Sequence, residues 1–262
     1  MTKSDSKENI EQSIDVENSQ QEKILSNTLW VLVVLYVAVL LMSAPNQLLP
    51  GEPIWAVKYD TLIEIAKESL NFFFVLPIIS FAAAPFLDIP APVVHPTSEA
   101  FFNFAEAWIL MFLPLMLLDS RGRNLPRVAL WIAAMFLTNV FLTPYMAQRL
   151  RTPKSESVDK NQSLARAFGT IGLVVGTGAI AWFCFARPEF GGWAERVSYF
   201  AQKVRSDRVT IAFCVDLMLF WLFQCWLMGS EIAKESKQRL LQFVPFWGLA
   251  IWLVIRPSSH ER

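Results

Sequence analysis

Apolar residues in this 262-residue sequence gather into seven long runs separated by polar stretches. Each run has 16 to 22 residues, close to the roughly 20 that a helix needs to cross the hydrocarbon layer of a membrane. The runs are Thr28–Ala44, Leu70–Leu87, Ser98–Asp119, Arg127–Ala147, Arg166–Ala186, Val209–Met228 and Leu240–Ile255. The pattern predicts an all-α, polytopic membrane helix bundle with about seven transmembrane helices.

Two further stretches have the helical spacing of surface helices. In the first, one apolar face is formed by Trp55, Tyr59, Leu62, Ile63, Ala66 and Leu70. In the second it is formed by Trp193, Val197, Phe200, Ala201 and Val204. Charged residues fill the other side of each stretch, which is typical of amphipathic helices in the membrane interface. Arg196, Lys203 and Arg205 give the second helix a basic edge suited to anionic headgroups.

Composition agrees with a membrane protein and sets the domain limits. Hydrophobic residues make up 54% of the chain, above the 45–50% typical of soluble domains. Residues 1–25 are polar and charged, which predicts a disordered tail before a single transmembrane domain at 26–256 and a short tail at 257–262. The formal net charge is zero, so nucleic acid is not an expected partner.

A count of seven spans does not determine which side of the membrane the N-terminus faces. If the connecting segments alternate between the two sides, 11 Lys and Arg fall on the side of the N-terminus and 12 on the other. The positive-inside rule then favours neither side. A span count that is wrong by one would produce this result.

The run Ser98–Asp119 carries polar groups where a membrane helix should be apolar. Glu99, Asn103 and Glu106 recur at i, i+4 and i+7, so they share one helical face. A charged side chain at mid-membrane costs about 2.5–3.5 kcal/mol on insertion scales, which makes such residues candidates for function. The candidate polar intramembrane site comprises Asn103, Glu106, Asn139, Asp216 and Gln224.

Two interpretations of Glu106 stay open. It could bond to an amide on a neighbouring span, such as Asn139 or Gln224, and fix helix packing. It could instead line a cavity and bind a proton, a cation or a polar ligand group. Asp216 presents the same choice, and water or the side chain of Arg208 could reach it from two turns away.

Glycines in the fifth run suggest close helix packing. Gly172 and Gly176 form a G-x-x-x-G pair, which lets two helix backbones approach closely in lipid. The neighbour could be another helix of the same chain or a second protein.

Catalytic and metal-binding motifs are missing from the sequence. It has no histidine-rich metal cluster, no H-E-x-x-H zinc site, no G-x-S-x-G nucleophile and no nucleotide-binding glycine pattern. Cys184, Cys214 and Cys225 lie in apolar runs without CxxC spacing and are expected to be buried thiols. The residues identify no cofactor, no metal site and no catalytic residue, so an enzyme is possible but unsupported.

Two stretches, Leu118–Arg149 and Ser206–Leu227, resemble uncharacterised multi-span membrane proteins of cyanobacteria and plastids. The resemblance covers roughly residues 98–149 and 206–228 and rests on no motif of known mechanism. It implies a location in a photosynthetic membrane, thylakoid or plasma membrane, and no activity.

The first functional expectation is a non-catalytic assembly, cofactor- or lipid-binding, or interaction protein of a photosynthetic membrane. Its partners would be the lipid bilayer, other membrane proteins or pigments. The alternative is a small-solute or ion transporter that uses Glu106 and Asp216. A third hypothesis is a lipid- or isoprenoid-modifying enzyme that lacks a known motif.

Overall fold

The computed structural model describes residues 3–45, 47–153 and 162–256, with side chains from residue 17 onward. This part of the chain is built from helices and contains no β-strand. The longer helices are α1 (Lys3–Leu35), α2 (Tyr59–Leu70), α3 (Val75–Ala83), α4 (Pro96–Leu118), α5 (Arg127–Arg149), α6 (Gln162–Phe185), α7 (Trp193–Ser206), α8 (Arg208–Glu231) and α9 (Trp247–Ile255). An all-α fold is therefore confirmed.

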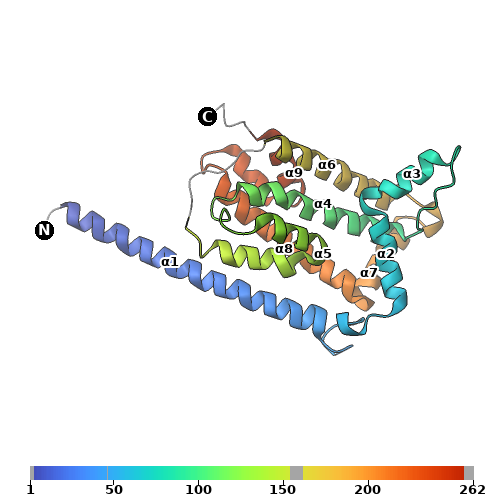
Figure 1. The fold of residues 1–262 in the computed structure, drawn as a ribbon, viewed down its shortest axis with the longest axis horizontal. Coiled ribbons are helices and arrows are strands. Elements are labelled where there is room, and N and C mark those ends of the chain that lie inside the picture. The colour runs from blue at the N-terminus through green and yellow to red at the C-terminus, as the bar shows by residue number, and fades with distance from the viewer. Residues whose placement is uncertain (1–2, 46, 154–161, 257–262) are drawn as a thin grey trace.

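Helix α4 is the centre of the bundle. It packs most extensively on α6 and also contacts α5 and α8, and most of its residues are buried (Figure 1). Helix α1 continues into a π-helical segment, Tyr36–Met42, and lies along the side of the bundle beside α5. Helices α1, α4, α6 and α8 each run from one end of the bundle to the other (Figure 1).

Helix α5 enters the bundle and turns back. Its backbone leaves the helical conformation at Leu137 and Thr138, with φ of 31° at Thr138. Arg127, at its start, donates to the backbone oxygen of Leu117 at 2.8 Å, while Arg149, at its end, binds Asp119 at 2.7 Å. A straight helix of 23 residues would separate its ends by about 33 Å. Both ends can reach the same end of α4 only because α5 is a re-entrant hairpin with its tip at Leu137–Thr138.

The C-terminal segment makes a second turn of this kind. The 3₁₀ helix η5 (Lys237–Phe243) leads inward from the end of α8, and the chain reverses at Phe246, where φ is 60°. Helix α9 then runs outward along α6, so that Gly176 faces Phe246, Gly169 faces Leu253, and Gln162 donates to the backbone oxygen of Arg256. Its nine residues are about 14 Å long, half a membrane thickness.

Helices α2, α3 and α7 lie together at the end of the bundle that is opposite to the start of α1 (Figure 1). Both predicted amphipathic helices are present, as α2 and α7, and an ion pair between Glu64 and Lys203 joins them. The predicted second span, Leu70–Leu87, is not one helix. Phe73 and Phe74 both have positive φ and separate α2 from the short α3.

The structure gives a smaller number of spans than the sequence suggested. Among the described residues, five helices are long and apolar enough to cross a membrane, namely α4, α5, α6, α8 and the segment Glu17–Met42 of α1. A multi-pass membrane protein is compatible with this result, and the count of seven is not confirmed. Of the five, α5 meets the criteria of length and composition but folds back on itself.

Helix α1 begins at Lys3 and includes residues 3–25 of the predicted polar tail. Both halves of α5 bond to α4 or to Asp119 at its end: Trp131 donates to the backbone oxygen of Ile109, and Tyr145 and Arg149 donate to Asp119. The predicted tail at 257–262 lies outside the described residues.

The ion pair of Asp119 and Arg149 anchors the re-entrant α5. The guanidinium donates to both carboxylate oxygens, at 2.7 and 2.8 Å, and the Tyr145 hydroxyl donates to the same carboxylate at 2.6 Å. Burial alone would raise the pKa of Asp119, but the hydrogen bonds and charge of Arg149 outweigh it and lower the pKa. Both side chains are almost fully buried.

We predict that Asp119→Asn lowers the free energy of unfolding by about 3–5 kcal/mol, because it leaves the buried guanidinium of Arg149 without its counter-charge. Denaturant unfolding of the detergent-solubilised protein measures this change. Glu189→Gln, which removes an exposed carboxylate at the other end of the bundle, serves as the control and should change stability by less than about 0.5 kcal/mol. Equal stability of the two variants would contradict the anchoring role.

The re-entrant topology also bears on the orientation. With α5 re-entrant, four of the five candidate helices remain to cross the membrane, and the start of α1 and the end of α9 lie at the same end of the bundle (Figure 1). Of the 20 Lys and Arg in the described residues, seven belong to segments at the opposite end. These seven are Lys58, Lys67, Arg187, Arg196, Lys203, Arg205 and Arg208. The other 13 described Lys and Arg lie at the end where α1 begins, and the positive-inside rule associates such an excess with the cytoplasmic side.

We predict that green fluorescent protein fused to either terminus is fluorescent, because both fusions stay in the cytoplasm. Alkaline phosphatase inserted after Asp88 should be active, because that loop lies on the outside. A seven-span protein would place its termini on opposite sides. Phosphatase activity at the C-terminus would therefore refute the re-entrant topology.

Candidate functional site

The carboxylate of Asp216 is the centre of a polar cluster inside the bundle. It is 3% exposed and accepts hydrogen bonds from the Tyr36 hydroxyl at 2.8 Å, the Thr138 hydroxyl at 2.7 Å and the Asn139 amide at 2.6 Å. Helices α1, α5 and α8 contribute these groups. Asp216 and Asn139, two of the residues singled out in the sequence, are thus in direct contact.

Two of these three helices are irregular where they meet Asp216. Tyr36 is the first residue of the π-helical segment of α1, and Thr138 is the tip of the re-entrant α5. Non-helical backbone at membrane depth is tolerated only where protein buries it or where it lines a water-filled space. Interrupted helices and π-helical turns are frequent at functional sites, and discontinuous helices form the binding sites of many transporters.

Glu106 lies at a similar depth on the neighbouring α4. Contacts between Phe101 and Phe213 and between Phe112 and Phe220, with ring centres 6.1 and 5.7 Å apart, set α4 beside α8 and bracket both carboxylates. The two carboxylates are close enough for their charges to interact. Glu106 is 5% exposed, and its Oε2 atom has no hydrogen-bond partner in the described part of the chain.

The Oδ1 atom of Asn139 is likewise buried without a partner among the described residues. A native structure rarely leaves such acceptors unsatisfied, because each costs about 1–3 kcal/mol. Glu106 Oε2 and Asn139 Oδ1 therefore mark the neighbourhood of Asp216 as a place for a proton, a cation or a polar ligand group.

Asn103 lies apart from this cluster and shapes the chain reversal after α2. Its amide oxygen accepts from the backbone N–H of Phe73, and its amide nitrogen donates to the backbone oxygens of Glu99 and Asn71. The fully buried Glu99 accepts from the Asn71 side chain at 2.6 Å, Trp182 at 2.7 Å and Arg187 at 3.2 Å. This set of bonds ties the start of α4 to the end of α6.

Gln224 supports the second re-entrant segment. Its amide nitrogen donates to the backbone oxygens of Gln242 and Val244, and its amide oxygen accepts from Trp108 at 3.0 Å. The Trp221 side chain donates to the backbone oxygen of Phe243. These bonds satisfy carbonyl groups that the short 3₁₀ helix leaves open. No hydrogen bond to Glu106 is seen for Gln224 or Asn139 among the described residues.

The glycine pair packs within the chain. A Cβ atom at Gly172 would lie 2.2 Å from the Met111 sulfur, and one at Gly176 would lie 2.3 Å from the Phe246 ring. Gly172 thus allows α6 to approach α4 closely, and Gly176 makes room for the tip of the second re-entrant segment. Gly176 is therefore directed toward the interior of this chain.

Two arginines have structural partners that the sequence did not reveal. Arg196, interpreted as part of a basic surface edge, is 1% exposed and donates to backbone oxygens at the end of α6, including those of Trp182 and Arg187. Arg208 donates to the backbone oxygens of Ser43, at 2.7 Å, and Leu49. It stabilises the loop after α1, and no bond from it to Asp216 is present in the described structure.

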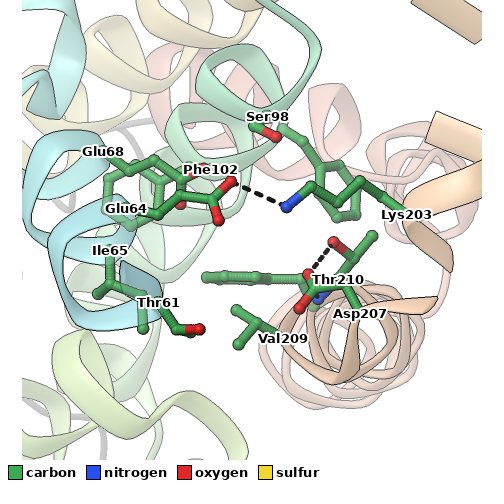
Figure 2. Close-up of a pocket in the computed structure, with 12 residues that line it drawn as sticks. Thr61, Glu64, Ile65, Glu68, Ser98, Phe102, Lys203, Asp207, Val209 and Thr210 are labelled. Carbon is green, nitrogen blue, oxygen red and sulfur yellow. Dashed lines mark hydrogen bonds and ion pairs between the residues drawn. The ribbon is translucent and has the colours of Figure 1, made fainter. Parts of the chain in front are cut away.

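A hollow between α2 and α7 lies at the outer end of the bundle and was not anticipated. Figure 2 shows Glu64 and Glu68 of α2 facing Lys203 of α7 and Asp207 at the start of α8. Glu64 pairs with Lys203 at 2.8 Å, and Asp207 accepts from the backbone and hydroxyl of Thr210, which begins α8. A neighbouring cavity of about 360 Å³ continues this hollow along α7.

Glu68 forms no ion pair with a described residue, and its environment favours the protonated form. Burial, together with the charge of Glu64, raises its pKa to about 7. No residue of α2 is fully buried, and its ion pair with α7 is that of Glu64 with Lys203.

Comparisons of the chain with protein-family models, curated proteins and solved structures give no match. Within the described ranges, no group of three or more His, Cys, Asp or Glu is arranged to hold a metal ion. The geometry of the polar centre is thus the main guide to function.

We predict that α2 loosens as the pH rises from about 4.5 to about 7. In that range an unfolded or detached glutamate ionises while Glu68 in the folded protein keeps its proton, so the attached state loses stability with rising pH. Hydrogen exchange of residues 59–70, corrected for the intrinsic effect of pH, measures the change. Glu68→Gln should remove the pH dependence, and a dependence that persists in this variant would assign it to another group.

Proposed function

We propose that this chain moves a small ion or solute across the membrane, with Glu106 and Asp216 at the centre of its path. The observation that carries the proposal is the meeting of a buried carboxylate with the re-entrant tip of α5 and the π-helical start in α1. Transporters commonly place their ion and substrate sites where helices are interrupted near the middle of the membrane.

The two carboxylates have different surroundings, which suggests different tasks. Three donors hold Asp216, so it is a fixed acceptor that positions the tip of α5. Glu106 lacks such donors and is free to take up and release a proton or to coordinate an arriving cation. A cation bound between them would also satisfy the open oxygen of Asn139.

Movement of the re-entrant tip offers a way to open this centre. Thr138 bonds directly to Asp216, so any change in charge at that carboxylate acts on the hairpin tip. A tip that moves would expose Glu106 and Asp216 to one side of the membrane at a time, as alternating access requires.

An assembly or lipid-binding protein is the second candidate, and one observation favours it. All three donors to Asp216 are side chains of the protein itself, so this carboxylate is hydrogen-bonded without a ligand. In this reading the centre fixes helix packing. The photosynthetic membrane implied by the sequence resemblance remains a proposal in both cases, and no catalytic step is assigned.

We predict that the full chain, reconstituted in vesicles that contain a pH-sensitive dye, accelerates proton entry when a pH gradient is imposed and the potential is clamped with K⁺ and valinomycin. Glu106→Gln should reduce the rate to that of protein-free vesicles, because an amide of the same shape cannot carry a proton. Glu189→Gln, at an exposed site, should keep the wild-type rate. The same vesicles are tested with Na⁺ and K⁺ gradients.

A second readout is independent of the transported species. Dicyclohexylcarbodiimide, which modifies protonated carboxyl groups in apolar surroundings, should label Glu106 in the native protein and leave Glu106→Gln unlabelled. Wild-type flux in Glu106→Gln would contradict the proposal. Absence of flux of H⁺, Na⁺ and K⁺ together with absence of labelling would favour the assembly protein.

A further inference from the structure

A hollow of about 560 Å³ lies at the end of the bundle that carries the termini. Three separate elements surround it: helix α1, the turn after α4 and the segment after α5. Its lining contains three cationic side chains, Lys23, Arg121 and Arg151, and one carboxylate, Glu22. The hollow therefore carries an excess of positive charge.

Two of the three cationic side chains, those of Arg121 and Arg151, are held by contacts with helix α1. Arg151 donates to the Ser26 hydroxyl at 2.8 Å and to the Asn27 side chain at 2.6 Å, which fixes it against α1. Arg121 pairs with Glu22 at 2.5 Å. Lys23 is exposed, and no carboxylate of the described residues forms an ion pair with it.

The depth of the hollow corresponds to the headgroup layer of a membrane. Lys23 precedes the apolar part of α1, which starts at Thr28, by about 7 Å of helix. Arg121 follows the last residue of α4 by three positions, and Arg151 follows the last residue of α5 by two. The polar layer on each side of the hydrocarbon core is about 5–7 Å thick, so all three cations lie within or next to it.

We propose that this hollow binds the phosphate headgroup of an anionic phospholipid, with Lys23, Arg121 and Arg151 as its ligands. The inference rests on the cytoplasmic orientation of this end and not on the translocation proposed above. Anionic lipids are enriched in the cytoplasmic leaflet, and basic pockets beside membrane helices on that side bind such headgroups.

Bound lipid would act on the re-entrant α5. Arg151 and the Ser26 hydroxyl link the foot of α5 to α1, and Ser26 donates in turn to the backbone oxygen of Ala147. A headgroup that bridges Arg121 and Arg151 would therefore join the two loops on either side of α5. The lipid would stabilise the hairpin whose tip contacts Asp216.

The test is native mass spectrometry of the delipidated full chain titrated with phosphatidylglycerol and, separately, phosphatidylcholine. The wild type should bind one phosphatidylglycerol more tightly than any phosphatidylcholine. Lys23→Gln with Arg151→Gln should weaken this binding by roughly fivefold for each charge removed, since a surface cation contributes about that factor. Lys67→Gln with Arg205→Gln, which removes the same charge from exposed positions at the opposite end, is the matched control and should not change it.

A second variant distinguishes a loss of lipid binding from a loss of folding. Ser19→Glu adds a negative charge to the hollow at an exposed position and leaves every cation and its contacts in place. It should weaken phosphatidylglycerol binding as well, with unchanged thermal stability in lipid-free detergent. Unchanged binding in both hollow variants, or equal affinity for the two lipids, would overturn the proposal. Displacement of the lipid by inorganic phosphate at millimolar concentration would assign the hollow to a soluble anion and overturn the lipid assignment.

Discussion

A helix that enters a membrane and returns needs both of its ends held at the same surface, and Asp119 and Arg149 supply that constraint here. Their buried ion pair joins the end of α4 to the end of α5 at 2.7 Å, while Arg127 fixes the start of α5 to the same place. Ten residues of helix before the turn and eleven after it then reach about half-way into the bundle. The position of Thr138 beside Asp216, and with it the whole polar centre, follows from this anchor.

Several irregular pieces of backbone in the described bundle are stabilised by hydrogen bonds from polar side chains. Lipid offers no hydrogen bonds, so an interrupted helix is stable only if the protein satisfies the groups that are released. Gln224 and Trp221 bond to carbonyl groups of the second re-entrant segment, and Arg196 and Arg208 bond to those at helix ends. The buried arginines of this chain thus serve its architecture, whereas Glu106 stands out because nothing described compensates for it.

The two ends of the bundle differ in chemistry in a way that suits a membrane protein with a fixed orientation. The end with the termini carries most of the basic residues and a positively charged hollow. The other end carries the carboxylates of α2, which are set against a single lysine of α7. Between the two surfaces, Asp216 and Glu106 lie where the tip of α5 reaches its greatest depth. A change at the surface that carries the Asp119–Arg149 pair can act on the centre through α5, which is anchored there and bonded to Asp216 at its tip.

The sequence by itself determined the class of protein, since hydrophobic runs and helical spacing depend only on local composition. It correctly indicated an all-helical chain with helices long and apolar enough to cross a membrane, and the amphipathic helices now seen as α2 and α7. It also singled out Asp216 and Asn139, which the structure brings into direct contact. It could not separate a span from a re-entrant hairpin, because both are apolar runs of about 20 residues. The difference depends on backbone angles at Thr138 and Phe246 and on partners such as Asp119 and Arg149, which lie 30 residues apart. Only the tertiary structure decided that Gln224 and Asn103 support turns, that Arg196 is buried, and that Glu106 is left without a partner.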